Sequence, residues 1–137
     1  MIIKIFSSLP NDAKLIRTNV FVEEQGFVEE FDSLDKISTH LVLYDNGKPV
    51  ATGRFYTENN NDYYIGRLSV IKEYRGRGLG SKIIDEAERI IALKGGKAIL
   101  LHSQCQAIPF YKIHGYQPFG ESDFDEDRPH QWMRKNI

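Results

Sequence analysis

A glycine-rich turn is the segment of this chain whose residue types point most directly to chemistry. It spans Tyr74–Ser81, reads YRGRGLGS, and lies between a segment patterned as a strand and one patterned as a helix. Alternating glycines let the backbone approach a ligand closely, and the start of the helix offers unpaired N–H groups and the positive end of its dipole. Because Arg75 and Arg77 add positive charge, the turn predicts a cradle for a diphosphate.

The glycine spacing separates this turn from two well-known phosphate motifs. A P-loop needs a lysine directly after its last glycine, but Gly80 is followed by Ser81 and then Lys82. The dinucleotide fingerprint leaves two residues between its second and third glycines, whereas only one separates Gly78 from Gly80. Taken alone, a flexible turn with solvated arginines explains the same residues.

The elements that must position the turn follow from the hydrophobic periodicity. Asn46 and Gly47 tolerate the positive φ of a tight hairpin and join two of the expected strands. Hairpin strands come first, and strands alternating with helices follow. This order predicts an α/β (mixed α+β) fold, a single domain over residues 1–137 whose central mixed sheet carries helices on both sides. We expect strands at 1–6, 40–44, 50–56, 63–70, 98–101, 116–119 and 131–135, helices at 11–24, from 79 up to Gly95 and at 107–114, and an acidic loop at 29–36.

Composition excludes several classes of protein. The net charge of -1 gives no overall field that would recruit nucleic acid or an anionic membrane. No apolar run reaches the roughly 20 residues that span a bilayer, and the N-terminus lacks the basic region of a signal peptide. The single Cys105 and the four histidines lack the spacing of a metal site, so we expect no required metal. These features predict a cytoplasmic protein.

The turn resembles the acyl-CoA signature of the GNAT superfamily of N-acetyltransferases, written Gln/Arg-x-x-Gly-x-Gly/Ala, through Arg75, Gly78 and Gly80. The preceding strand segment is similar to that family's fourth strand, where a bulge splays the sheet open. The resemblance implies that backbone groups of Leu68 and Val70 meet the pantetheine arm and the thioester carbonyl of acetyl-CoA, the cosubstrate. It also implies that the amides of the turn bind the pyrophosphate.

A second segment, from Gln104 to Tyr116, is similar to the family's Asn-x-x-Ala-x-x-Phe-Tyr-x-x-x-Gly-Phe/Tyr pattern. Gln104 stands where the family usually has asparagine, and its longer side chain can still reach the pantetheine. In the family, the tyrosine at the Tyr111 position often gives a proton to the departing thiolate. The residues implied to bind the cosubstrate are therefore Leu68, Ser69, Val70, Arg75, Gly76, Arg77, Gly78, Leu79, Gly80, Ser81 and Gln104.

A narrower likeness concerns the two ends of the chain. The segment Val20–Gln25, the pair Asp32 and Asp35, and His130 followed by Met133 resemble the ElaA-type subgroup. The acceptors of that subgroup are largely undefined, so the likeness does not name a substrate. The amine acceptor, a small molecule or a peptide, is left open by the sequence.

Acetyl transfer to an amine needs a neutral nucleophile, a polarised thioester and a proton for the thiolate. A backbone N–H at Val70 is suited to the developing oxyanion. The phenol of Tyr111 has an ordinary pKa of about 10, close to that of a thiol, although a core role explains the same side chain. We expect direct transfer in a ternary complex, because nothing near Cys105 in sequence activates it for an acetyl-cysteine route.

The base that takes the amine proton is not fixed by the sequence. Glu24 ends the first expected helix, which borders the acceptor cleft in this fold, and we name it as the catalytic candidate. His40, His102 and His130 are alternatives, as is a chain of waters with no single base. On the strands, Arg54 and Arg67 fit a structural ion pair better than a contact to an acidic acceptor.

Two other functions compete with acetyl transfer. A non-catalytic acyl-CoA-binding protein would keep the cradle without turnover. The hypothesis of a nucleic-acid-binding module is supported only by a basic patch, Lys72, Arg75, Arg77 and Lys82. The overall charge balance of the chain disfavours it. A homodimer is expected on general grounds, since symmetric dimers are the commonest oligomers.

Overall fold

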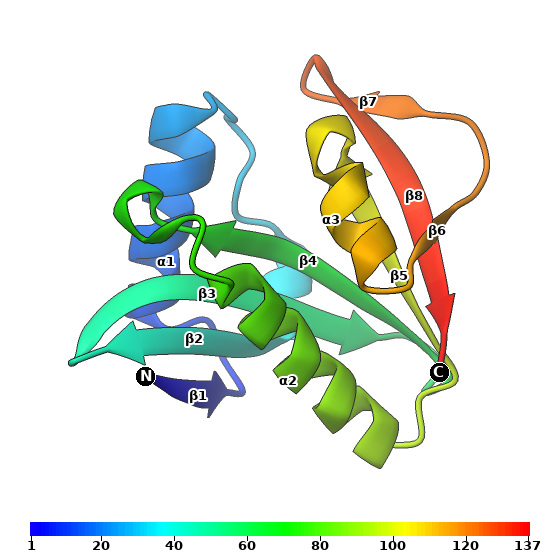
Figure 1. Ribbon diagram of the computed structural model, residues 1–137, viewed down its shortest axis with the longest axis horizontal. Coiled ribbons are helices and arrows are strands. Elements are labelled where there is room, and N and C mark those ends of the chain that lie inside the picture. The colour runs from blue at the N-terminus through cyan, green and yellow to red at the C-terminus, as the bar shows by residue number, and fades with distance from the viewer.

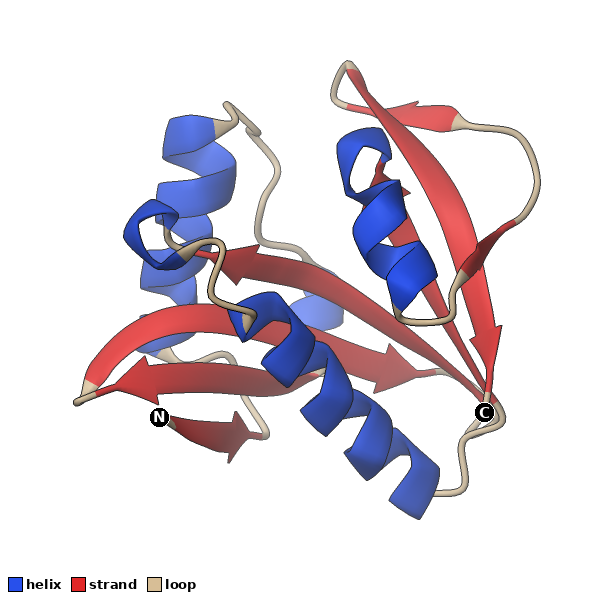
Figure 2. Ribbon diagram, viewed as in Figure 1, coloured by secondary structure: helices blue, strands red, loops and turns tan.

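In the computed structural model, which describes all 137 residues, one eight-stranded sheet carries helices on both faces (Figures 1 and 2). The strand order is β1-β2-β3-β4-β5-β8-β6, and β7 pairs with β8 outside that path. Only β4 and β5 run parallel, so the sheet is mixed as predicted. The strands are β1 (Ile2–Phe6), β2 (Thr39–Asp45), β3 (Lys48–Thr57), β4 (Asp62–Val70), β5 (Ala98–Gln104), β6 (Gln117–Pro118), β7 (Asp123–Asp125) and β8 (Arg128–Asn136), and the helices are α1 (Asn11–Arg17), α2 (Leu79–Leu93) and α3 (Ile108–Ile113).

Neighbouring residues of β3 show how the two faces of the sheet are used. A Cβ on Gly53 would lie 2.7 Å from Cγ2 of Ile83, so this position faces α2 and has no room for a side chain. Arg54 points to the opposite face, where its guanidinium contacts Asp35 on the side of α1. Figure 1 shows α1 and α2 on opposite sides of β2, β3 and β4. No helix combines the length and the apolar character that a membrane crossing requires.

The first expected helix differs from its prediction over its second half. It is α-helical only to Arg17 and continues as a π-helix, Thr18–Glu24. The wider turn is closed by the bond from Gln25 N–H to the Val20 carbonyl, 3.2 Å long, and it buries Val20 and Phe21. Apolar spacing fits both helix types, so the sequence could not separate them.

Two further segments differ from the sequence expectation. The acidic stretch at 29–36 is not all loop, because Ser33–Lys36 forms a 3₁₀ helix with a capping box between Asp32 and Asp35. The third helix begins at Ile108, after a 3₁₀ turn over Cys105–Ala107. Strand β7 was not predicted, since three residues give no readable period.

The sheet opens between β4 and β5, and this opening positions the site. The two strands pair only over Asp62–Tyr64 and Ala98–Leu100, although they continue to Val70 and Gln104. Opposite this region the β3–β4 register shifts between Thr52 and Arg54, and Arg67 has a positive φ of 53°. The predicted bulge on β4 is therefore confirmed, and it bends β4 away from β5.

A buried ion network anchors the acidic segment to α1 and β3. Arg17 contacts Glu30 and Asp35, each at 2.8 Å, and is 1% exposed. Arg54 contacts Asp35 at 2.8 Å, and Arg67 contacts Glu30 at 3.2 Å. The predicted structural pairing of Arg54 and Arg67 is thus confirmed. Burial alone raises the pKa of Asp35, but hydrogen bonds from Arg17 and Arg54 outweigh it and lower that pKa to about 2.

Replacing Asp35 with asparagine should destabilise the protein by about 3–5 kcal/mol, since Arg17 and Arg54 lose the charge that compensates them in the interior. Because the folded pKa of Asp35 lies below its ordinary value, its contribution is present above about pH 4 and is lost as the pH falls toward 2. Urea unfolding at pH 7 and across this window measures both effects. A loss below about 1 kcal/mol at pH 7, typical of a surface pair, would contradict this account.

Candidate active site

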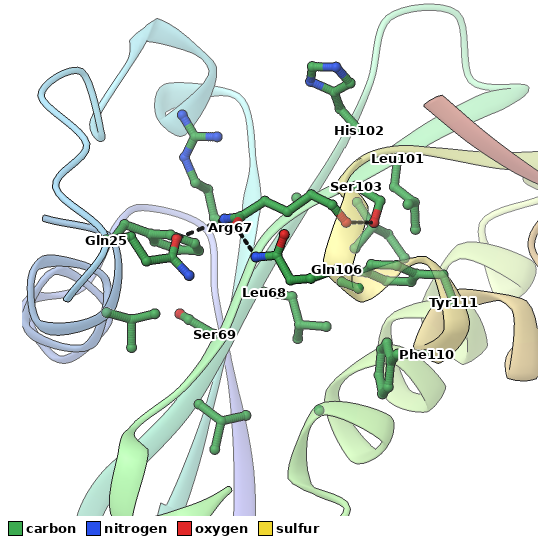
Figure 3. A pocket seen from close by; sticks show the side chains of 18 of the residues that line it. Gln25, Arg67, Leu68, Ser69, Leu101, His102, Ser103, Gln106, Phe110 and Tyr111 are labelled. Atoms are coloured by element: carbon green, nitrogen blue, oxygen red, sulfur yellow. Dashed lines mark hydrogen bonds between the residues drawn. The ribbon is translucent and has the colours of Figure 1, made fainter. Parts of the chain in front are cut away.

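A cavity of about 680 Å³ lies where β4 and β5 separate. Its walls come from the π-helix and the loop after it, from β4, from the glycine-rich turn, from β5 and α3, and from β7 and β8. Figure 3 shows the part of the lining that runs from Gln25 past Leu68 to Tyr111. Glu24 and Arg77 are the two predicted site residues outside its lining. The predicted residues that line the cavity are Leu68, Ser69, Val70, Arg75, Gly76, Gly78, Leu79, Gly80, Ser81, Gln104 and Tyr111.

The glycine-rich turn presents an unbroken row of free backbone donors. Six successive N–H groups, those of Gly76, Arg77, Gly78, Leu79, Gly80 and Ser81, donate to no acceptor in the protein; the first helical bond runs from Lys82 N–H to the Gly78 carbonyl. Gly76 and Gly78 have φ of 78° and 75°, angles that other residues rarely adopt. Such a row at a helix N-terminus binds an anion.

Gly80 has a different reason to be glycine. It lies within α2 with no positive φ, but a Cβ there would sit 3.4 Å from Cζ of Phe110. The residue therefore allows α2 and α3 to approach closely beside the cradle. Phe110 in turn packs on Tyr111, with ring centroids 5.0 Å apart.

The charged residues of the turn are engaged with the protein. Both nitrogens at the tip of Arg75 bind the Glu24 carboxylate, at 3.0 and 2.8 Å, and its Nε donates to the Val70 carbonyl. Arg77 lies over the ring of Tyr74, 4.7 Å from its centroid. Arg75 thus lines the cavity while Glu24 binds its guanidinium.

Ser69 carries an unsatisfied polar group on the wall of the cavity. Its residue is 5% exposed, and its Oγ has no hydrogen-bond partner. Figure 3 shows Ser69 on the side of Gln25, across Leu68 from Tyr111 and Phe110. A buried hydroxyl without a partner costs about 1–3 kcal/mol, which a polar ligand atom can recover. Together with the free amides, this orphan hydroxyl fits an arm such as pantetheine attached to a diphosphate.

Tyr111 brings a phenol to the α3 wall of the cavity. Burial raises its pKa above the ordinary value, and its hydroxyl makes no hydrogen bond within the protein. Tyr116 packs edge-on against the ring, with centroids 6.0 Å apart at 75°. The phenol therefore stays protonated through the neutral range, as a proton donor must.

The four candidates for the base occupy different surroundings. Glu24 is held by Arg75 as described. His40 is 1% exposed, lies outside the cavity, and its Nε2 is 3.0 Å from the Asp35 carbonyl, which can only accept a hydrogen bond. Burial lowers the pKa of His40, so it is a neutral structural residue. His102 and His130 both line the cavity.

Two contacts of the site, made by Gln25 and Asp123, gave no signal in the sequence. Gln104 donates to Oε1 of Gln25 at 2.8 Å, a bridge from β5 to the end of the π-helix across the cavity. Asp123 of β7 lies 2.6 Å from Nε2 of His102. Neither contact follows from local spacing, because the partners are 79 and 21 residues apart. Cys105 lies outside the cavity lining.

Known proteins share both the sequence and this architecture. YjcF, an uncharacterized N-acetyltransferase of Bacillus subtilis (strain 168), is 39% identical over 128 residues, which cover 91% of either chain. An acyl-CoA N-acyltransferase from Pseudomonas aeruginosa matches with a TM-score of 0.86 at 25% identity, covering 98% of both chains. Escherichia coli ElaA shares the fold with a TM-score of 0.84 at 24% identity, over 98% of this chain and 99% of that chain.

The family is settled by the match over most of the sequence. Residues 7–116 match the Acetyltransferase (GNAT) family. That range holds the bulged strand, the row of free amides and Tyr111, the same features that the resemblance rested on. The chain therefore belongs to the GNAT family of acetyltransferases.

Proposed function

We propose that this protein transfers the acetyl group of acetyl-CoA to the amine of a small molecule or peptide, directly within a ternary complex. The observation that carries the proposal is the row of six free N–H groups, five of whose residues line the same cavity as Tyr111. The N–H groups are suited to bind the diphosphate of the cosubstrate, and the phenol is suited to protonate its departing thiolate. Family membership supports the same chemistry.

Each predicted cosubstrate residue has a distinct task in this proposal. The amides of Gly76–Ser81 bind the pyrophosphate, with Arg75 turning toward it from Glu24. Backbone groups of Leu68 and Val70 align the pantetheine arm where β4 leaves β5, and Ser69 Oγ offers it a hydrogen bond. Arg77, which lies outside the cavity lining, contributes its backbone N–H. Gln104 can contact the pantetheine arm once its hydrogen bond to Gln25 is broken.

The transfer itself balances without a covalent enzyme intermediate. The amine nitrogen attacks the thioester carbonyl carbon, the C–S bond breaks, and the thiolate leaves with the electron pair. Tyr111 gives its proton to that sulfur and regains one from the acetylated nitrogen. The backbone N–H of Val70 is our candidate donor to the oxyanion. Glu24 is the base predicted from the sequence, but both of its carboxylate oxygens accept hydrogen bonds from Arg75 in this structure.

A panel of amines tests the proposed function. The protein is incubated with acetyl-CoA and, in turn, polyamines, amino sugars, aminoglycosides, free lysine and peptides with a free N-terminus, while release of the CoA thiol is followed. We expect amine-dependent release for at least one class. Tight CoA binding without release for any class would select the alternative, a non-catalytic acyl-CoA-binding protein. A homodimer stays a prediction, which sedimentation at micromolar concentration tests.

A further inference from the structure

Two histidines from neighbouring strands stack on one wall of the cavity. The rings of His102 in β5 and His130 in β8 lie with centroids 4.6 Å apart at 30°. Trp132 stacks on His102, 4.8 Å away, and Phe27 meets His130 edge-on at 6.4 Å. Four rings in a row, from three separate segments of the chain, hold the plane of His130 between Phe27 and His102.

Hydrogen bonding fixes which nitrogen of His130 carries the proton. Its Nδ1 lies 2.9 Å from the carbonyl oxygen of Arg128, which can only accept, so Nδ1 is the donor in the neutral ring. Nε2 then holds a lone pair and makes no hydrogen bond within the protein. The residue is 5% exposed and lines the cavity. A rigid imidazole therefore presents an unprotonated nitrogen at its tip beside the cavity.

His102 is arranged differently. Its Nε2 is 2.6 Å from Oδ1 of Asp123, so that nitrogen donates to the carboxylate. The remaining lone pair is on Nδ1, the ring nitrogen next to the carbon that bears Cβ, and so lies close to the strand. This makes His102 a support for the neighbouring ring rather than the residue that meets a ligand.

The hairpin that carries Asp123 is tied to the opposite wall. The carboxylate of Glu126, in the β7–β8 turn, accepts from the backbone N–H groups of Val28 and Glu29 at 2.7 and 2.8 Å. Arg128 donates to the Gln25 carbonyl and lies over the ring of Phe27. Both walls thus hold the stack at a fixed position.

Charges around the cavity favour a cation there. Glu29 and Asp125 line the cavity and take part in no ion pair within the protein, whereas Arg67 is neutralised by Glu30 and Asp32. These negative groups attract an ammonium acceptor to the cavity.

We propose that His130 is the base of the reaction, which rests on the function proposed above. Nε2 takes one proton from the acceptor ammonium, leaving a neutral amine whose lone pair attacks the thioester, and the imidazolium passes that proton to solvent. His102 and Asp123 are positioning residues that hold the ring of His130. Glu24, with both oxygens bound by Arg75, is not needed for this step.

The test compares two probe amines that differ in basicity, n-butylamine and 2,2,2-trifluoroethylamine, with saturating acetyl-CoA at pH 7. Butylamine is protonated in solution and needs a base, whereas the fluorines leave the second amine largely neutral. His130→Ala should lower kcat/KM for butylamine by about 10²–10⁴-fold, the range of general base catalysis, and less for trifluoroethylamine. Added imidazole should restore part of the lost rate. His130→Gln, which keeps the volume and a donor for Arg128, should show the same loss in a folded protein.

Matched variants separate catalysis from packing. His102→Phe keeps the stack but loses the contact with Asp123, and should cause a smaller loss that imidazole does not restore. Phe124→Ala, an exposed residue of the same hairpin, should leave the rate unchanged. Equal losses for both amines without rescue, or a near-normal rate in His130→Gln, would overturn the proposal. A wild-type protein that acetylates no amine would instead refute the proposed function.

Discussion

Replacing Gly78 with valine is expected to lower the affinity for CoA by more than about 100-fold. Gly78 is the N-cap of α2 with φ of 75°, an angle that a β-branched residue avoids. The turn must then rearrange, and the N–H groups of Leu79 and Gly80 lose their direction. Each hydrogen bond to a charged group contributes about 1.5–3 kcal/mol, so loss of two lowers affinity by more than about 100-fold. Calorimetric titration with CoA measures the change.

The glycine of the β2–β3 hairpin supplies a control for strain alone. Gly47 has φ of 83°, and a Cβ at either Gly47 or Gly78 would meet no other atom within 4 Å. Gly47→Val should therefore cost comparable stability while CoA affinity stays normal, because the hairpin lies outside the cavity lining. Unchanged CoA affinity in a folded Gly78→Val protein would refute the cradle.

The second large effect is expected from removing the hydroxyl of Tyr111. If it protonates the thiolate, Tyr111→Phe should lower kcat by about 10²–10⁴-fold, as loss of a general acid does. The ring still packs on Phe110 and Tyr116, so CoA affinity and stability should change little. Steady-state rates with the best amine from the panel, together with thermal melting, measure both.

The neighbouring tyrosine is a matched control for this change. Tyr116 is fully buried, and its hydroxyl donates to Glu88 at 2.8 Å. Tyr116→Phe should lower stability by about 1.5–3 kcal/mol, because the lost bond goes to a carboxylate, and should leave kcat normal, the reverse of the Tyr111 result. If Tyr111→Phe also keeps a near-normal kcat, solvent or another group supplies the proton, and the phenol is a packing residue.

Features fixed by local geometry were predictable from the sequence. Asn46 and Gly47 form the expected hairpin because both adopt positive φ, 48° and 83°. Gly76 and Gly78 also adopt positive φ, which glycine tolerates best. The glycine spacing of the turn was therefore enough to predict a cradle for a diphosphate. The bulge at Arg67 came from the family resemblance, since a lone arginine in a strand carries no such signal.

Features that depend on distant partners were not predictable. The acidic segment at 29–36 was predicted to be a loop, and nothing in its spacing shows that Glu30 and Asp35 are buried because arginines from α1, β3 and β4 converge on them. The imidazole stack likewise needs the register of β5 and β8, which pairs Gln104 with His130. The close packing at Gly80 also depends on a distant residue, because the ring of Phe110, from α3, lies beside it.

In the proposed reaction the acetyl group of acetyl-CoA ends on an amine nitrogen. The test incubates catalytic amounts of the protein with the best amine of the panel and with acetyl-CoA that carries ¹³C at the acetyl carbonyl. The product is then examined by NMR and mass spectrometry. We expect the label in an amide bonded to the amine, one equivalent for each CoA thiol released, and none on the protein. Label recovered as free acetate, or held on Cys105, or left on CoA, would contradict the account.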